Sequence, residues 1–328
     1  MKKKNKDRVV FFNGKFVKEN EAKVSIYDSA LMFGDMVFEM TRSFNKKQFM
    51  LEEHIDRLLI GLKILRIPLK YTKKQIIDYC HETIAVNRDA MEDDDEDRLM
   101  IDVSRGLLDI YKGVEGLHHG PNLIIANFPL KWTVQGMGSL FNTGINAVVT
   151  PQRAIPSQYM DPKIKNRSRL FYLNANIEAS ALKGKNNWPI LLDVNGYITE
   201  GTGDNFFIVK DNKVLTPYGK DILRGISRNY VLYDLCEQLK INSAEANIEP
   251  YDVYTADEAF MTGTPFCMLP VTNFNGLQIG NGKRGKIFNK LLSQWSKNVS
   301  VDIEKQIKTW NKNKQKNKLK VSPYSFKR

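Results

Sequence analysis

Apolar and polar residues alternate first in short runs separated by tight turns. Residues 9–17 read as a β-hairpin around Asn13-Gly14, and residues 38–51 as a second hairpin around Asn45-Lys46. Asn-Gly and similar dipeptides between β-prone runs favour two-residue hairpin turns. Residues 24–27 are also β-prone. The N-terminal part of the chain therefore predicts a small sheet, which residues 24–27 are expected to extend.

Helical spacing replaces this alternation from residue 52 onward. Apolar side chains recur every three or four residues over 52–65, and Pro68 lies just beyond that run, so a helix is predicted to end there. A second helix is predicted over residues 73–87, followed by strands at 99–103 and 123–127. The later predicted strands are 146–150, 190–194, 197–200, 206–209, 213–215 and 259–261, and the later helices are 169–183, 227–239 and 286–295.

Mixed elements in a chain of 328 residues predict an α/β (α+β) protein with two lobes, because one core rarely grows that large. The small α+β lobe is expected over residues 9–145, and the larger lobe over 153–304. A linker is placed at 146–152, after a glycine-rich stretch. The acidic run at 92–97 is expected to be a solvated loop.

A net charge of +12 suggests nucleic-acid binding, but the distribution of the charge along the chain argues against it. Residues 1–8 form a basic tail, with net +4 over residues 2–8, and residues 305–328 carry nine basic and no acidic side chains. The segment between them is therefore close to neutral. Such tails are usually solvated and flexible, so a nucleic-acid-binding protein acting through them is kept only as a remote alternative.

The expected cellular compartment and metal content are inferred from sequence patterns that were not found in the chain. No apolar run approaches the roughly 20 residues of a membrane span, and no signal-peptide pattern follows the basic N-terminus, so the cytoplasm is expected. Cys80, Cys236 and Cys267 are far apart in sequence. They predict buried thiols rather than a disulfide framework or metal site, and no metal is expected.

Four local patterns carry candidate chemistry, and each also has an ordinary structural explanation. Gly225-Ile226-Ser227 precedes a helix and suits either an anion site or a simple helix cap. Residues 262–265 follow a predicted strand, and they could form either part of a phosphate-binding site or an ordinary loop. Arg57 follows His54 by three residues, so both face one side of a helix, and the arginine could grip phosphate or form a surface salt bridge. Glu200 closes a strand and could pair with a cationic ring nitrogen or merely end a hairpin.

Their order along the chain resembles that of the class IV aminotransferases, between about residues 9 and 300. The resemblance rests on the following segments: Phe33-Gly34-Asp35-Met36-Val37-Phe38-Glu39, His54-x-x-Arg57-Leu58, Lys165, residues 192–207 around Thr199-Glu200-Gly201-Thr202-Gly203-Asp204-Asn205, Leu223-Arg224-Gly225-Ile226-Ser227-Arg228, and Asp257-Glu258-Ala259-Phe260-Met261-Thr262-Gly263-Thr264.

This resemblance implies a two-lobed enzyme of fold type IV that binds pyridoxal 5'-phosphate (PLP) and acts as a homodimer. It implies that Lys165 forms the Schiff base, and that Glu200 pairs with the pyridine nitrogen and makes the ring an electron sink. Tyr172 would bind the ring hydroxyl. The remaining cofactor residues, which would hold the phosphate, are Arg57, Gly225, Ile226, Ser227 and Thr264.

The lysine assignment departs from the commoner family pattern. Those members place the lysine four or five residues before the tyrosine, whereas Lys165 stands seven before Tyr172. This chain resembles a subgroup of the family that carries an Arg-Ser-Arg insert, here residues 167–169. That subgroup shares the longer spacing between the lysine and the tyrosine. Lys163 is therefore kept as the alternative.

Substrate residues are less fully matched. Arg98-Leu99-Met100 stands where branched-chain members carry a Tyr-x-Arg pair. Arg105, in contrast, resembles the carboxylate-binding arginine of D-amino acid aminotransferases and aminodeoxychorismate lyases, although Leu107 replaces the histidine expected next in the former. The substrate-binding set implied by the resemblance is Phe33, Phe38, Arg105, Thr264 and Pro265.

The leading hypothesis is a transaminase that moves an amino group from an amino acid, branched-chain by default, to a 2-oxo acid such as 2-oxoglutarate. A D-amino acid transaminase and a 4-amino-4-deoxychorismate lyase are the alternatives within the family. The lyase differs in needing no 2-oxo acid.

Overall fold

The computed structural model describes residues 7–313, and these divide into two units. Residues 7–130 together with 164–169 form the first unit, and residues 131–163 together with 170–313 form the second. Short helices and mixed strands in both units confirm the expected α/β class.

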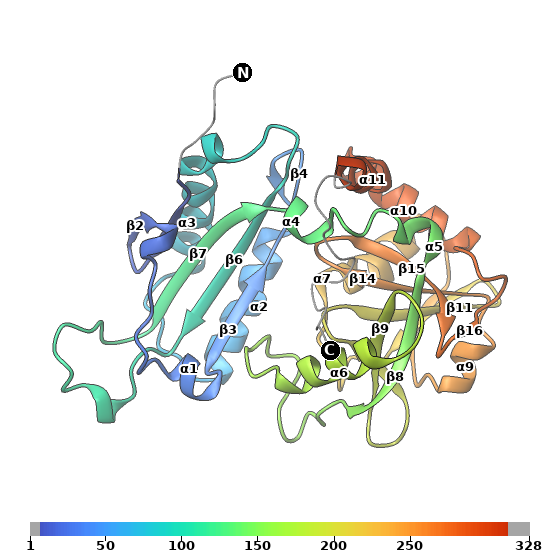
Figure 1. Cartoon of the computed structure of the whole chain (residues 1–328), viewed down its shortest axis with the longest axis horizontal. Coiled ribbons are helices and arrows are strands. Elements are labelled where there is room, and N and C mark those ends of the chain that lie inside the picture. The colour runs from blue at the N-terminus through green and yellow to red at the C-terminus, as the bar shows by residue number, and fades with distance from the viewer. Residues whose placement is uncertain (1–6, 314–328) are drawn as a thin grey trace. The chain divides into compact units, whose positions relative to one another are not determined.

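The first unit is built on a five-stranded antiparallel sheet with the order β2-β1-β7-β6-β3 (Figure 1). Its elements are β1 (Val9–Phe12), β2 (Lys15–Lys18), α1 (Ser29–Phe33), β3 (Met36–Met40), β4 (Ser43–Phe44), β5 (Lys47–Gln48), α2 (Leu51–Ile64), α3 (Lys73–Val86), β6 (Asp97–Ser104) and β7 (Asn122–Pro129). The hairpin expected around Asn13-Gly14 is confirmed, and β4 and β5 form the turn around Asn45-Lys46.

The core of the first unit lies between this sheet and helices α2 and α3. Ile55 and Leu58 of α2 are completely buried, as their helical spacing predicts. They belong to one apolar cluster with Val37 of β3 and Ile101 of β6. Ile164 belongs to the same cluster, which explains why residues 164–169 pack with the first unit rather than with their sequence neighbours.

The second unit is built on a nine-stranded mixed sheet. Its elements are α4 (Lys131–Val134), α5 (Leu140–Thr143), β8 (Ile145–Arg153), α6 (Leu170–Ala181), β9 (Asn187–Leu192), β10 (Ile198–Gly201), β11 (Asn205–Lys210), β12 (Lys213–Pro217), α7 (Ile226–Asn229), a π-helical turn (Tyr230–Leu235), α8 (Cys236–Gln238), β13 (Ser243–Ala246), α9 (Pro250–Tyr254), β14 (Glu258–Gly263), β15 (Cys267–Phe274), β16 (Leu277–Gln278), α10 (Lys286–Asn298) and α11 (Ile303–Asn313).

Six of these strands close into a ring. The sheet runs β10-β9-β8-β15-β14-β11, and the pairing of Glu200 with Asn205 joins β10 back to β11. Helix α6 packs against β8 and β9 (Figure 1). Because β10 and β11 are joined by only three residues, the ring holds Glu200 and Asn205 side by side.

The expected linker at 146–152 lies inside strand β8, which pairs in parallel with β9 and β15. The two units divide instead at Leu130 and Lys131. The linker was expected after the glycine-rich stretch, with that stretch at the end of the first lobe. The stretch belongs to the second unit instead, and its apolar residues are buried there. These residues are Val134, Met137, Leu140 and Phe141.

The acidic run was wrongly expected to be fully solvated. Glu96 is buried and accepts hydrogen bonds from the Ser43 hydroxyl and from the backbone N–H groups of Asn45 and Lys46. Asp97 is also buried and begins β6. The Glu96 carboxylate satisfies the turn between β4 and β5, whereas the Asp97 carboxylate accepts from Asn127. The charge pattern alone reveals neither role.

Residues 24–27 do not form the expected strand, and Ile26 is largely exposed. The C-terminal basic region was expected to be unstructured from residue 305. Helix α11 instead continues to Asn313, with Ile307 and Trp310 buried. Residues 1–6 and 314–328, which hold most of the two basic tails, lie outside the described residues.

Cys80, Cys236 and Cys267 are buried free thiols, as expected. Burial raises the pKa of Cys236 to about 11 despite a hydrogen bond with Ser243. Among residues 7–313, the helices are all too short or too polar to cross a membrane.

Candidate active site

Glu39 forms the centre of a buried ionic network in the first unit. It lies on β3 and is completely inaccessible to solvent. Its two carboxylate oxygens contact Arg57 through Nε at 2.6 Å and Nη2 at 2.8 Å, and His54 Nδ1 at 2.7 Å. His54 and Arg57 both come from α2, one helical turn apart. The arginine that could have formed a surface salt bridge is therefore bound to a carboxylate in the core.

Burial alone would raise the pKa of Glu39, but the charge of Arg57 and the contact with His54 outweigh burial and hold that pKa far below its usual range. Burial lowers the pKa of His54, which the Glu39 carboxylate opposes, and the charges of Arg57 and Lys165 reinforce the decrease. An ionised carboxylate can only accept hydrogen bonds, so neutral His54 donates from Nδ1. Its Nε2 is buried without a hydrogen-bond partner among the described residues.

Lys165 belongs to the first unit and lies over the same strand. Its backbone carbonyl accepts a hydrogen bond from Phe38 N at 2.9 Å, and its Nζ lies 4.8 Å from the centroid of the Phe38 ring. Arg167 also lies over this ring, at 3.7 Å, and its Nη2 pairs with Asp102 at 2.8 Å. Phe38 is therefore covered by the amine and guanidinium groups of this segment.

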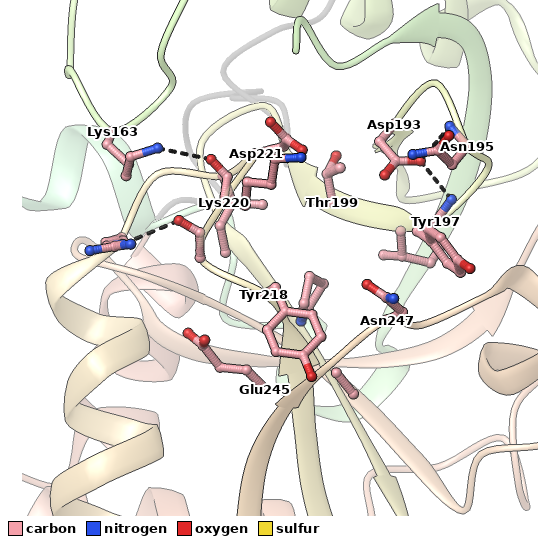
Figure 2. Close-up of a pocket in the computed structure, with 16 residues that line it drawn as sticks. Lys163, Asp193, Asn195, Tyr197, Thr199, Tyr218, Lys220, Asp221, Glu245 and Asn247 are labelled. Atoms are coloured by element: carbon pink, nitrogen blue, oxygen red, sulfur yellow. Dashed lines mark hydrogen bonds between the residues drawn. The ribbon is translucent and has the colours of Figure 1, made fainter. Parts of the chain in front are cut away.

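Lys163 has different surroundings, in the second unit. Its ammonium group pairs with Asp161 at 2.8 Å and donates a hydrogen bond to the carbonyl of Lys220 at 2.9 Å, as Figure 2 shows for the latter contact. It lines a cavity of about 620 Å³ together with Tyr218 and Asn247. The donors of this amine are therefore directed at a carboxylate and a carbonyl of the second unit.

Glu200 is the buried carboxylate at the centre of the second unit's candidate site. Its Oε1 accepts hydrogen bonds from the Tyr172 hydroxyl at 2.6 Å and from Leu223 N at 3.1 Å, and its Oε2 accepts one from Asn205 Nδ2 at 3.0 Å. Tyr172 comes from α6, and Leu223 from the segment that follows β12. Three separate segments therefore orient one carboxylate, which a charged hairpin end would not require.

Asn205 connects Glu200 to the Gly225 turn. Its Nδ2 also donates to the carbonyl of Leu223 at 2.9 Å. A Cβ atom at Gly225 would lie 2.1 Å from Asn205 Oδ1, so only glycine permits this approach. Asn205 stands in the quoted motif, but no role was assigned to it, because an asparagine after a turn usually has only a local function.

The Gly225 contact yields a first prediction. Gly225→Ala should displace the Asn205 side chain, lower the free energy of unfolding by about 1–3 kcal/mol and weaken cofactor binding, because overpacking a buried contact costs about that much. The measurements are urea unfolding and PLP titration of the purified variant. Gly203→Ala is the matched control, since its added Cβ meets no atom within 4 Å. Equal stability and PLP binding in the two variants would contradict this role of Asn205.

The strand that precedes Thr264 contributes a further polar group. Thr262 of β14 pairs with Asn205 of β11, so their side chains are on the same face of the sheet as Glu200. The Thr262 hydroxyl is buried and has no hydrogen-bond partner among the described residues. Thr264 and Pro265 follow in the turn to β15 and are half-buried. Thr262 belongs to the segment 262–265 that was considered as part of a phosphate-binding site, and its position opposite Asn205 follows once the strands are aligned.

Arg105 is already engaged within the first unit. Its Nε and Nη2 pair with Asp35 at 2.5 and 3.1 Å, and its remaining donors contact the carbonyls of Leu65 and Arg66. Phe33, at the end of α1, is largely exposed, whereas Phe38 is buried. The structure therefore brings Phe38 to Lys165, while Arg105 contacts Asp35.

These residues have the donor and acceptor chemistry that PLP requires. Glu200 offers a buried carboxylate for a protonated ring nitrogen, and Tyr172 a hydroxyl beside it. Thr262 holds an unsatisfied buried hydroxyl, and Arg57 a partly accessible guanidinium for phosphate. Arg57 and Lys165 belong to the first unit, and the others to the second.

Comparison with known proteins agrees with this chemistry. The class IV aminotransferase family matches residues 36–274. A putative branched-chain-amino-acid aminotransferase of Methanocaldococcus jannaschii is 37% identical over 86% of this chain and 93% of its own length. A D-alanine aminotransferase of Bacillus licheniformis is 29% identical over 88% and 99%. The crystal structure of the Escherichia coli branched-chain amino acid aminotransferase matches with a TM-score of 0.79 and 28% identity, covering 88% of this chain and 94% of that one.

The chain belongs to the class IV aminotransferases. It is a PLP-dependent transaminase of fold type IV, which confirms the family, the enzyme class and the cofactor expected from the sequence motifs.

Proposed function

We propose that this enzyme transfers the amino group of branched-chain L-amino acids to a 2-oxo acid such as 2-oxoglutarate, with Lys165 as the cofactor-bearing lysine. The observation that carries the cofactor assignment is the buried Glu200 carboxylate, oriented by Tyr172, Asn205 and Leu223 N. The names of several relatives support the branched-chain substrate. We also propose a homodimer, as the family resemblance implies.

Each proposed residue has a separate role. When bound, PLP would supply an electron sink for the substrate Cα, and Glu200 would keep the proton on the ring nitrogen that this chemistry requires. Tyr172, whose hydroxyl donates to Glu200, would bind the ring hydroxyl. Lys165 would bear the cofactor and, once the incoming substrate amine has replaced it there, its freed amine would move the proton at Cα as general acid and base. The proposed phosphate-binding groups are Arg57, Gly225, Ile226, Ser227 and Thr264.

The substrate wall is proposed to include Phe33, Phe38, Thr264 and Pro265, which are mostly apolar and suit a branched aliphatic side chain. Arg105 supports the D-amino acid alternative less well, because Asp35 occupies the side of the guanidinium that would bind a carboxylate. The similarity to a D-alanine aminotransferase nevertheless makes this the second candidate.

A panel of amino donors with 2-oxoglutarate as acceptor tests the proposal. We expect turnover with L-leucine, L-isoleucine and L-valine, and little with D-alanine. Turnover with D-alanine alone would replace the proposal by the second candidate. Formation of 4-aminobenzoate from 4-amino-4-deoxychorismate without any 2-oxo acid would identify a lyase.

A further inference from the structure

The charge of Glu39 is in a place where the fold by itself favours an apolar residue. Glu39 lies two residues after Val37 on β3, so both side chains face α2, and Val37 belongs to the apolar core. An ion pair buried in such a position stabilises a fold no better than well-packed apolar residues do. Packing therefore does not explain why a carboxylate stands at position 39. Its contacts with Arg57 and His54 do explain it.

Its contacts fix the direction of the Arg57 guanidinium. Glu39 binds the Nε and Nη2 edge, which uses two of the five N–H groups that an arginine carries. Because the guanidinium is planar and rigid, the other N–H groups are then directed away from Glu39. The side chain of Arg57 is 14% exposed, so part of it is accessible to solvent.

His54 holds the carboxylate from its other side. It contacts Oε2, the oxygen that also accepts from Arg57 Nη2, and it is itself 1% exposed. A carboxylate with both oxygens engaged cannot rotate without breaking a buried contact. The network is therefore a rigid support for one guanidinium, built from β3 and α2.

We propose that Glu39 is the positioning residue that directs Arg57 at the cofactor phosphate, with His54 holding Glu39 in place. The inference rests on the proposed function, which assigns Arg57 to the phosphate. Residues that orient a ligand-binding group typically contribute about 10–100-fold to affinity, by analogy with those behind metal ligands. Loss of the Glu39 charge should therefore weaken PLP binding to that extent, through the phosphate alone.

The test compares PLP with pyridoxal, which has the same aldehyde and ring but no phosphate. Both are titrated into the cofactor-free wild-type protein and Glu39→Gln, and the dissociation constant of pyridoxal divided by that of PLP reports the phosphate contribution. We expect Glu39→Gln to reduce this ratio about 10–100-fold and to leave pyridoxal affinity nearly unchanged. Glu96→Gln removes another buried carboxylate of the same unit and should leave the ratio unaltered.

The outcomes separate this inference from the proposed function. If Arg57→Gln keeps the wild-type ratio, Arg57 does not bind the phosphate, and that part of the proposed function fails. If Arg57→Gln reduces the ratio but Glu39→Gln does not, the positioning role of Glu39 is refuted. In the Arg57→Gln background, Glu39→Gln should have little further effect.

Circular dichroism and thermal unfolding check that each variant folds. If Glu39→Gln does not fold, Glu39→Asp replaces it, because aspartate keeps the charge but is one methylene too short to hold both guanidinium nitrogens. It should also reduce the ratio of the pyridoxal dissociation constant to that of PLP, and an unchanged ratio in a folded Glu39→Asp protein would overturn the proposal.

Discussion

Lys165→Ala should abolish the visible absorbance band of the lysine-bound cofactor and lower kcat by at least about 10²–10⁴-fold, the usual contribution of a general acid–base group. The loss should be larger still, because the same side chain also bears the cofactor. Absorbance spectra of the purified variant and transaminase assays with L-leucine measure both effects.

Lys163→Ala is the matched control, two residues away. Its ammonium is paired with Asp161 and the Lys220 carbonyl, so its removal should leave the band and most of the activity intact. If the band instead survives in Lys165→Ala and disappears in Lys163→Ala, the cofactor is carried by Lys163. The family assignment would then stand, and the residue assignment would change.

Glu200→Gln should lower kcat by about 10²–10³-fold, comparable with the loss of one preorganised polar group in an active site. A neutral amide cannot keep a proton on the ring nitrogen. Its carbonyl can still accept from Tyr172 and Leu223, but its NH₂ group then faces Asn205 Nδ2, another donor. This mismatch should cost about 1–3 kcal/mol of stability. Steady-state assays and urea unfolding measure the two effects separately.

Glu258→Gln provides the comparison for this variant. Glu258 accepts hydrogen bonds from the backbone of Ile287 and Phe288 at the start of α10, so its loss should affect stability but not kcat. A Glu200→Gln enzyme with wild-type kcat would show that Glu200 has only a structural role.

The sequence predicted best where the controlling interactions are local. The apolar spacing of residues 52–65 and the Asn13-Gly14 turn each depend on neighbours within a few positions, and α2 and the β1–β2 hairpin appear accordingly. The run around Glu200 was recognised because turn, carboxylate and strand lie together in a single continuous segment.

The predictions of secondary structure and burial failed where contacts with residues distant in the sequence determine them. Strand β15 was not predicted. It contains Pro270, a residue type uncommon in central strands, yet it pairs with both β8 and β14. The acidic run was expected to be solvated, but Glu96 is buried. It accepts hydrogen bonds from N–H groups of a hairpin that lies some fifty residues earlier in the sequence.

By itself, the sequence determined the class of enzyme, its cofactor and the candidate residues, because motif residues and short-range periodicity are visible along one dimension. Only the tertiary structure decided how the charges are paired. It buried Glu39 against Arg57, bound Arg105 to Asp35, and separated Lys163 from Lys165 by placing them in different units. The physical reason is that the cost of a charge depends on burial and on partners far away in the chain, which no local pattern contains.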